Sequence, residues 1–351
     1  MVHDINGNST IKTNFIVLIV LILLSYPLFY FSYKFCLPDF GGEDYYAYQY
    51  LYKDWNFAKV PSPFNMRIIS SFCVYIINHI GLDYNTETVF SVIHPAFSRQ
   101  VFFNAVLFNY ACVVATCFVV YQTILSFANN KFFALVGGCV YLLGFGTLFF
   151  ALKPMSDSCG IFLMAIAFYF YSRKKYTIFL VLIISVFQRE YIFIVFSIIS
   201  LVEYFFVRQK YYLWIFIGSA LCFIIYYVLR KTLFYTPHFE SQTSPAVFVR
   251  SLFSPSIDWF PFFKQTLFIS NLFFIYIFVI VYKKINHLTV NKIFLIAVLI
   301  LLLQVILMSI MAHFGNNAGR YFYFISPILI FYLFIELKPL VERYFHFINN
   351  V

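Results

Sequence analysis

The chain has 351 residues, of which 62% are hydrophobic and only 11% are charged. Soluble domains average about 45–50% apolar and about 25% charged residues, so this composition excludes an ordinary water-soluble globular protein. The net charge of +10 comes from bases dispersed among loops, which argues against a nucleic-acid-binding face and indicates contact with anionic membrane lipids.

Apolar stretches follow one another along the whole chain and predict an all-α, polytopic integral membrane protein, with a single transmembrane domain over 1–351. A helix needs roughly 20 apolar residues to cross the hydrocarbon core, and its backbone polar groups must bond internally. The ten predicted spans cover 14–34, 101–128, 132–152, 157–172, 176–188, 190–207, 211–229, 265–282, 291–312 and 320–337.

The short loops between these spans alternate in charge, which predicts the orientation. The clusters Arg173-Lys174-Lys175 and Lys283-Lys284 contain no acid, and lysine and arginine stay on the cytoplasmic side of a membrane. We therefore expect both termini in the cytoplasm, a location in the cell inner (plasma) membrane, and chemistry on the outer face. Four of the 14 acids are predicted to lie inside: Asp4, Glu203, Glu336 and Glu342.

Two long segments, 35–100 and 230–264, are predicted to be extracytoplasmic loops. The first contains DYYAYQYLYKDW, which repeats aromatic residues at helical spacing from Tyr45 to Trp55 and predicts an interfacial helix. The next apolar piece, 68–80, is short for a span, and its crossing would invert every later loop. We expect it to stay on the outer face or to enter the membrane and return.

Three acids follow the first predicted span closely: Asp39, Glu43 and Asp44 in the sequence PDFGGEDYY. The two glycines allow a turn that directs these carboxylates toward the membrane. A carboxylate there can act as a general base on a hydroxyl or hold a divalent metal, although nothing in the sequence requires a metal. The alternative is a solvated loop in which Glu43 and Asp44 stabilise a helix N-terminus.

Charged residues at the outer ends of other apolar stretches are further candidates for a substrate site. Arg67 and Arg320 each open an apolar helix and suit a phosphate group, with extension to lipid headgroups as the alternative for Arg67. Asp157 starts a span, where N-capping is the alternative. Arg189 and Glu190 lie between two apolar runs and need partners, which are either neighbouring side chains or a ligand.

These motifs resemble those of the GT-C glycosyltransferases, which are multi-span enzymes that use lipid-linked sugars as donors. The sequence GEDYYAYQY is similar to their acidic first loop, PFNMRIIS to a Pro-aromatic-x-x-Arg stretch of related bacterial membrane proteins, and KPMSD and RE to charged marks in their loops. The resemblance implies a GT-C-like fold, a catalytic carboxylate at Asp44 with Glu43 beside it, and a donor-phosphate contact at Arg67.

The predicted function is transfer of a sugar from a polyprenyl-phosphate donor to a glycan or lipid acceptor outside. Nucleotide sugars are not supplied to that face, so the activated donor must arrive in the lipid. Arginines can stabilise its phosphate leaving group. The alternatives are a membrane glycan polymerase or ligase, a transporter or flippase of lipid-linked sugars, and a non-catalytic membrane subunit. We expect membrane lipids, the lipid-linked sugar and the acceptor as partners, and no nucleic acid.

Overall fold

The computed structural model describes residues 5–35, 42–83, 88–89, 98–235, 271–292, 294–296, 298–300, 303 and 320–349. All regular structure in these ranges is helical, so the predicted all-α class is confirmed for them. Glu43, Asp44 and Arg320 belong to helices, but their side chains lie outside the described part of the chain.

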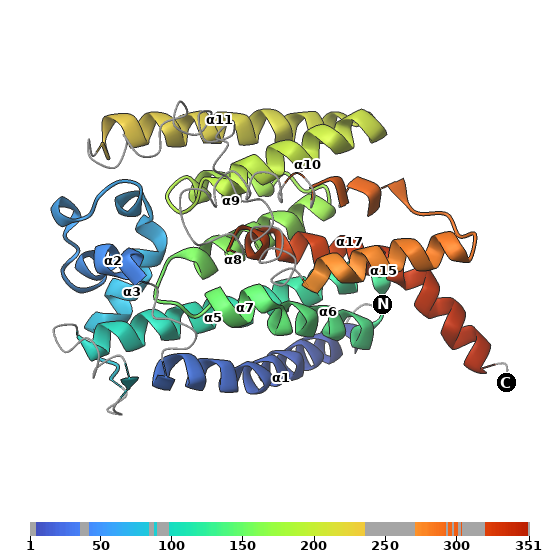
Figure 1. Cartoon of the computed structure of the whole chain (residues 1–351), viewed down its shortest axis with the longest axis horizontal. Helices are drawn as coiled ribbons and strands as arrows, with labels where there is room; N and C mark the ends of the chain where they lie inside the picture. Colours follow the sequence, from blue (N-terminus) through green and yellow to red (C-terminus); the bar gives the residue numbers. More distant parts are fainter. Residues whose placement is uncertain are drawn as a thin grey trace, which may run out of the picture.

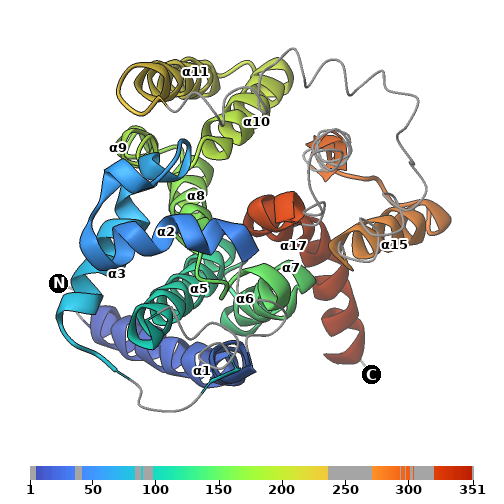
Figure 2. The ribbon, with the colours of Figure 1, turned by 60° about the vertical axis from the view of Figure 1, so that its left-hand side comes forward.

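The helices form one bundle, and α2 and α3 lie across one end of it (Figure 1, Figure 2). The elements are α1 (Ile5–Phe35), α2 (Gly42–Asp54), η1 (Phe57–Lys59), η2 (Phe64–Met66), α3 (Ile68–His79), α5 (Arg99–Ala128), α6 (Lys131–Leu143), α7 (Phe145–Phe150), α8 (Asp157–Ser172), α9 (Ile178–Ser185), α10 (Tyr191–Val207), α11 (Lys210–Thr232), α15 (Asn271–Ile285) and α17 (Arg320–Asn349).

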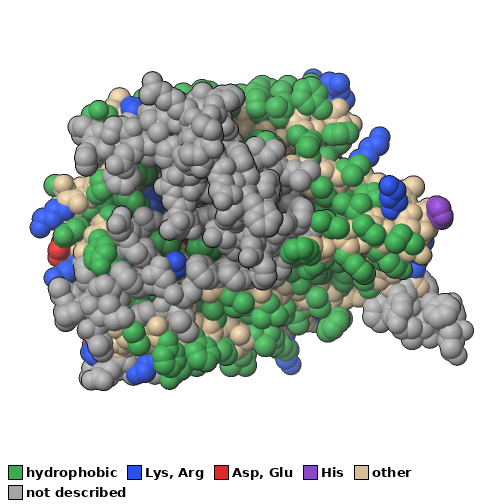
Figure 3. Space-filling view, in the orientation of Figure 1, with side chains coloured by type: hydrophobic (Ala, Val, Ile, Leu, Met, Phe, Trp, Pro, Cys, Tyr) green, Lys and Arg blue, Asp and Glu red, His purple; other side chains and the backbone are tan. Residues whose placement is uncertain are grey.

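The protein is membrane-embedded. Within the described ranges, four helices are long and apolar enough to cross a membrane: Ile11–Phe35, Arg99–Ala128, Lys210–Thr232 and Tyr323–Arg343. Shorter apolar helices cover Ile68–His79, Lys131–Leu143, Asp157–Ser172 and Tyr191–Val207. Large hydrophobic side chains lie on the exposed sides of helices such as α1 and α11, and Figure 3 shows many hydrophobic side chains on the described part of one face. Such a surface requires lipid or protein around it. The count of ten spans stays a prediction.

Two predicted spans are interrupted in the structure, and a third, 320–337, is part of the longer helix α17. The predicted span 132–152 is divided at Gly144, where the backbone turns to an extended conformation between α6 and α7. The predicted span 176–188 is helical only over α9, and residues 186–190 form turns. Those turns contain Gln188 and Arg189, whose polar side chains need partners that a continuous apolar helix surface does not provide.

Helix α5 is at the centre of the bundle and contacts α1, α3, α6, α8 and α17. Its buried face alternates apolar residues with small or amide side chains, which allows several neighbours to approach. Helix α10 packs chiefly against α11, forming a hairpin on one side of the bundle (Figure 2). The centre of the structure is therefore a helical core, and the polar groups described below lie toward one end of it.

The tyrosine-rich helix α2 is held within the protein. Tyr45, Tyr48 and Tyr52 are at most 1% exposed, and α2 contacts α3, η2 and α5. The sequence predicted an interfacial helix from this aromatic stripe; its place at the interface stays a prediction, and the buried tyrosines face other parts of the protein. The physical reason is that other aromatic rings cover the stripe: the Tyr45 ring meets Phe102 of α5 edge-on, and the Tyr48 ring meets Phe64 of η2 edge-on.

Candidate functional site

Buried polar side chains gather where α2 and α3 cover the end of the bundle. They come from five parts of the chain: α2, the η2–α3 junction, the start of α8, the α9–α10 connection and the second half of α11. We call this set the polar cluster; its members are Tyr48, Arg67, Ser156, Asp157, Gln188, Arg189, Glu190, Tyr226 and Arg230. The members come from positions between 48 and 230 in the chain, so the cluster is a product of tertiary packing.

Arg67 lies inside the protein at the start of α3, with 6% of its surface exposed. Its guanidinium donates a hydrogen bond to the Tyr48 hydroxyl and stands over the Tyr48 and Phe64 rings, 5.6 and 5.0 Å from their centroids. The Tyr48 hydroxyl also bonds to Ser156 Oγ at 2.8 Å. Arg67 is therefore held by two aromatic rings and the Tyr48 hydroxyl, and its side chain is not extended toward lipid headgroups.

Asp157 and Arg189 form a buried ion pair between the first residue of α8 and the α9–α10 connection. Their side chains are 1% and 5% exposed. The Arg189 side chain crosses α8 at Gly160, where an added Cβ would lie 2.7 Å from Arg189 Cγ and 2.5 Å from the Tyr191 hydroxyl. Only glycine leaves this space, so α8 is shaped to receive the arginine. Ser156 makes no side-chain capping bond, because its hydroxyl bonds to Tyr48.

Gln188 ties three segments together around the ion pair. Its Oε1 accepts a bond of 3.0 Å from the Ser70 backbone N–H of α3, and its Nε2 donates a bond of 2.8 Å to the Ser156 carbonyl. The Ile69 N–H also bonds to the Phe187 carbonyl at 3.4 Å. These bonds position the start of α3, and with it Arg67, against the turn that carries Arg189.

Glu190 provides the second carboxylate of the polar cluster. It lies in the α9–α10 connection, is half-buried, and accepts a hydrogen bond of 3.2 Å from the Tyr226 hydroxyl of α11. Burial favours the neutral acid and would raise the pKa of Glu190, but Arg67, Arg189 and Arg230 together hold that pKa below its usual value. Glu190 is therefore an anion at neutral pH.

The described charges of the polar cluster are three guanidiniums and two carboxylates, which leaves an excess of positive charge. The ring of Phe324 on α17 closes one side, with its centroid 6.0 Å from the Arg189 guanidinium and 4.2 Å from the parallel ring of Tyr191. Charges surrounded by rings and helices are screened weakly, so they interact strongly with any anion that enters. The arrangement is suited to binding a phosphate or a carboxylate.

The structure brings together four of the seven residues predicted from sequence: Arg67, Asp157, Arg189 and Glu190. Asp44 is in the first turn of α2, one helical turn before Tyr48, and Glu43 precedes it. Arg320 is the first residue of α17, one turn before Phe324. Glu43 and Asp44 are thus close in the chain to Tyr48 of the polar cluster, and Arg320 is close to Phe324, but the side chains of these three residues are outside the described set.

Sequence reasoning missed the polar partners that connect the predicted charges, namely Tyr48, Ser156, Gln188, Tyr226 and Arg230. Gln188 carried the clearest signal, because it stands beside Arg189 and Glu190 between two apolar runs. Tyr48 was assigned to the aromatic stripe of an interfacial helix. Arg230 was assigned to a long loop, although it belongs to the last turn of α11. Hydroxyl partners such as Tyr226 could not be identified, because no spacing pattern in the sequence distinguishes them from other tyrosines.

Among the side chains that the structure describes, no group of three or more His, Cys, Asp and Glu residues could hold a metal ion. The predicted metal ligands Glu43 and Asp44 are not in that set. The metal therefore stays a prediction.

Comparison of the chain with protein-family models, with curated proteins and with solved structures found no match.

Proposed function

We propose that this membrane protein is a glycosyltransferase of GT-C architecture, which moves a sugar from a polyprenyl-phosphate donor to a glycan or lipid acceptor on the extracytoplasmic face. The observation that carries the proposal is the polar cluster with its excess of positive charge, inside a membrane-embedded helix bundle. A phosphate that is borne by a lipid can reach such a site from the membrane. Guanidiniums suit it because they bind phosphate oxygens in bidentate geometry.

In this mechanism Arg67 contacts the donor phosphate and stabilises the negative charge that grows on it as the sugar leaves. Preorganised donors of this kind contribute most when they are fixed before the reaction. The rings of Phe64 and Tyr48 and the hydroxyl of Tyr48 supply that fixation. Arg189 is oriented by Asp157 and adds a second guanidinium to the same region. Arg320 is a third phosphate contact in this proposal.

Asp44 acts in this proposal as the base that takes the proton of the attacking hydroxyl, with Glu43 as a supporting acid or metal ligand. Its place in α2, one turn before Tyr48, supports this assignment because Tyr48 bonds to Arg67. A base and a phosphate-binding arginine would then be carried by α2 and α3, which pack against each other.

The test is sugar transfer by the purified full chain in lipid nanodiscs, with radiolabelled polyprenyl-phosphate sugars and a membrane lipid extract as acceptor. We expect Asp44→Asn to abolish transfer while thermal unfolding is unchanged. Asp54→Asn, at the exposed end of the same helix, is the matched control and should retain full activity. Full activity of Asp44→Asn would remove the role given to this carboxylate. Profiling the acceptors distinguishes a polymerase or ligase, because a polymerase extends its product repeatedly.

A transporter or flippase of lipid-linked sugars is the second candidate, and one observation favours it. Buried charged groups also occur far from the polar cluster: Lys283 of α15 pairs with Glu336 of α17, and Tyr332 donates a bond of 2.7 Å to Glu203. Transporters carry such groups along a substrate path. Proteoliposomes loaded with a fluorescent lipid-linked sugar would show translocation without consumption of the donor if this function is the correct one.

A further inference from the structure

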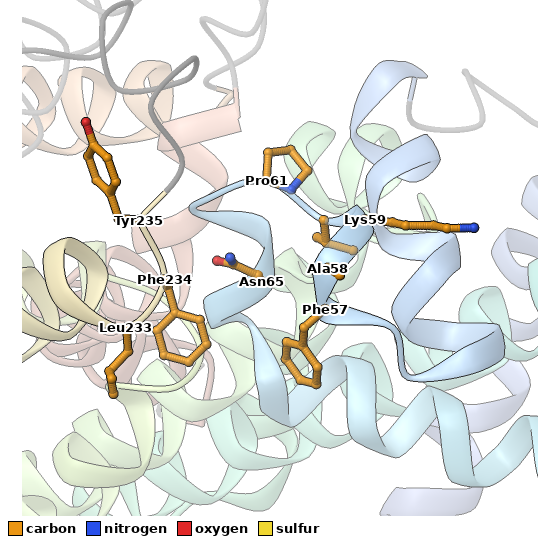
Figure 4. A pocket seen from close by; sticks show the side chains of 9 residues that line it. Phe57, Ala58, Lys59, Pro61, Asn65, Leu233, Phe234 and Tyr235 are labelled. Atoms are coloured by element: carbon orange, nitrogen blue, oxygen red, sulfur yellow. The ribbon is translucent and has the colours of Figure 1, made fainter.

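An open groove of about 550 Å³ lies between the first-loop segment and the end of α11 (Figure 4). We call it the first-loop groove; it is lined by Phe57, Ala58, Lys59, Val60, Pro61, Asn65, Leu233, Phe234 and Tyr235. We propose that the first-loop groove binds a neutral pyranose ring of the glycan substrate. The choice of a sugar as ligand rests on the proposed function, whereas binding in the groove is measured without turnover.

Asn65 is the polar group that points to a ligand. Its side chain is 7% exposed, and its Oδ1 has no hydrogen-bond partner among the residues that the structure describes. Figure 4 shows its amide between the two walls of the groove, directed toward the end of α11. A buried amide oxygen without a partner is unfavourable, and a ligand hydroxyl would satisfy it.

The walls of the first-loop groove suit the apolar face of a sugar ring. Phe57 on one wall and Phe234 on the other are both half-buried, and Figure 4 shows their rings in the same part of the groove. Tyr235 adds an exposed ring with a hydroxyl group. Small-molecule sites typically combine such aromatic walls with a few polar groups that fix the orientation, in cavities of about 300–1,000 Å³.

The charge of the first-loop groove argues against an anionic ligand. Lys59 is the charged residue among its described lining residues, and its ammonium group lies 5.3 Å from the ring centroid of Tyr50. In Figure 4 the Lys59 side chain extends away from Asn65 and Phe234. The groove therefore presents an amide and aromatic rings, whereas the guanidiniums belong to the polar cluster.

Both walls of the groove continue directly into the polar cluster. Asn65 is two residues before Arg67 in the same turn, and Leu233 is three residues after Arg230 at the end of α11. A substrate with a phosphate beside a sugar would therefore place its phosphate among the guanidiniums and its pyranose ring in the first-loop groove. This division explains why a neutral aromatic surface adjoins a buried cluster of positive charge.

The experiment measures binding to the full chain in nanodiscs with three probes: a polyprenyl phosphate, the same lipid phosphate bearing a hexose, and a free oligosaccharide. We expect Asn65→Ala and Phe234→Ala to weaken binding of a sugar-bearing probe about tenfold, since one lost contact of this kind corresponds to roughly that factor. Binding of the bare lipid phosphate should not change. Lys53→Gln, at an exposed position near the end of α2 and outside the groove lining, is the matched control and should behave as the unaltered chain.

The probe that binds more weakly to the variants shows whether the groove holds the sugar of the donor or of the acceptor. Weaker binding of the hexose-bearing lipid assigns the groove to the donor, and weaker binding of the free oligosaccharide assigns it to the acceptor; both outcomes support the proposal. Equal loss for the bare lipid phosphate, no loss for any probe, or no sugar-dependent binding at all would overturn it. Sugar binding without transfer would refute the proposed function alone. The two variants lie on different elements, and thermal unfolding identifies a variant that fails to fold.

Discussion

Asp157, the first residue of α8, is paired with Arg189 from the α9–α10 connection, and both side chains are at least 95% buried. The pair joins two segments that are 32 residues apart in the chain. A buried ion pair adds little net stability, but removing one partner leaves the other charge uncompensated. The pair therefore makes the position of the Arg189 guanidinium a requirement of the fold, which is useful if that guanidinium also binds a substrate.

Removal of one partner should destabilise the protein strongly. We expect Asp157→Asn or Arg189→Gln to lower the free energy of unfolding by about 3–5 kcal/mol. The double variant Asp157→Leu with Arg189→Met should be close to neutral for stability and should still lose lipid-phosphate binding. Thermal unfolding and binding in nanodiscs measure both effects. Glu342→Gln, at the exposed end of a pair with Lys338, is the control and should change stability by less than about 1 kcal/mol.

Enlarging Gly160 should displace Arg189 without altering any charge. A Cβ at this position would lie 2.7 Å from Arg189 Cγ, so Gly160→Ala forces the arginine or α10 to move. We expect a loss of about 1–3 kcal/mol in unfolding free energy, with weaker binding of polyprenyl phosphate. Gly160→Ser should be worse than Gly160→Ala. An unchanged affinity in both variants would show that the position of Arg189 is unimportant for binding.

Removing the Tyr48 hydroxyl should affect Arg67 more than it affects packing. Tyr48→Phe keeps the ring but leaves the Arg67 guanidinium and Ser156 Oγ without this partner. We expect a cost of about 1–3 kcal/mol and a lower kcat for sugar transfer, because the arginine is less well oriented. The matched control is Tyr46→Phe, whose ring is exposed on the same helix. Equal effects of the two changes would contradict the role of Tyr48.

The folded protein should lose stability at acid pH, because Glu190 becomes protonated. Its pKa is lowered in the folded protein, because the arginines outweigh the effect of burial. The stabilisation is therefore fully present above the pKa of the unfolded chain, about 4.3, and is lost as the pH falls through the lower folded pKa. Thermal unfolding between pH 3 and 7 should show this loss, and Glu190→Gln should reduce it. An identical pH profile in Glu190→Gln would contradict the assignment.

The predicted orientation places two exposed lysines on opposite sides of the membrane. Lys59, beside the first-loop groove, should face the extracytoplasmic side, and Lys175, between α8 and α9, should face the cytoplasm. Cysteines introduced at these positions should react with a membrane-impermeant maleimide from opposite sides of sealed vesicles. Reaction of both from the same side would remove the outer location of the polar cluster and, with it, the argument for a lipid-borne donor.

Much of the fold could be predicted because its signals are local. Runs of apolar residues predicted helices that agree closely with α5, α8, α10 and α11, since a helix in lipid must satisfy its own backbone. Burying a charged arginine side chain costs free energy, so the sequence also indicated that Arg67 and Arg189 need partners. These inferences depend on composition and spacing, which the chain displays directly.

The identity of the partners depended on tertiary structure. Asp157 and Glu190 are both near Arg189 in the fold, but only packing determines that Asp157 forms the ion pair and that Glu190 accepts from Tyr226. The sequence likewise indicated an amphipathic α2 without indicating that its tyrosines face protein. Composition and periodicity specify which surfaces avoid water, whereas the choice among several acids, arginines and aromatic surfaces requires distances between segments that are far apart in the chain.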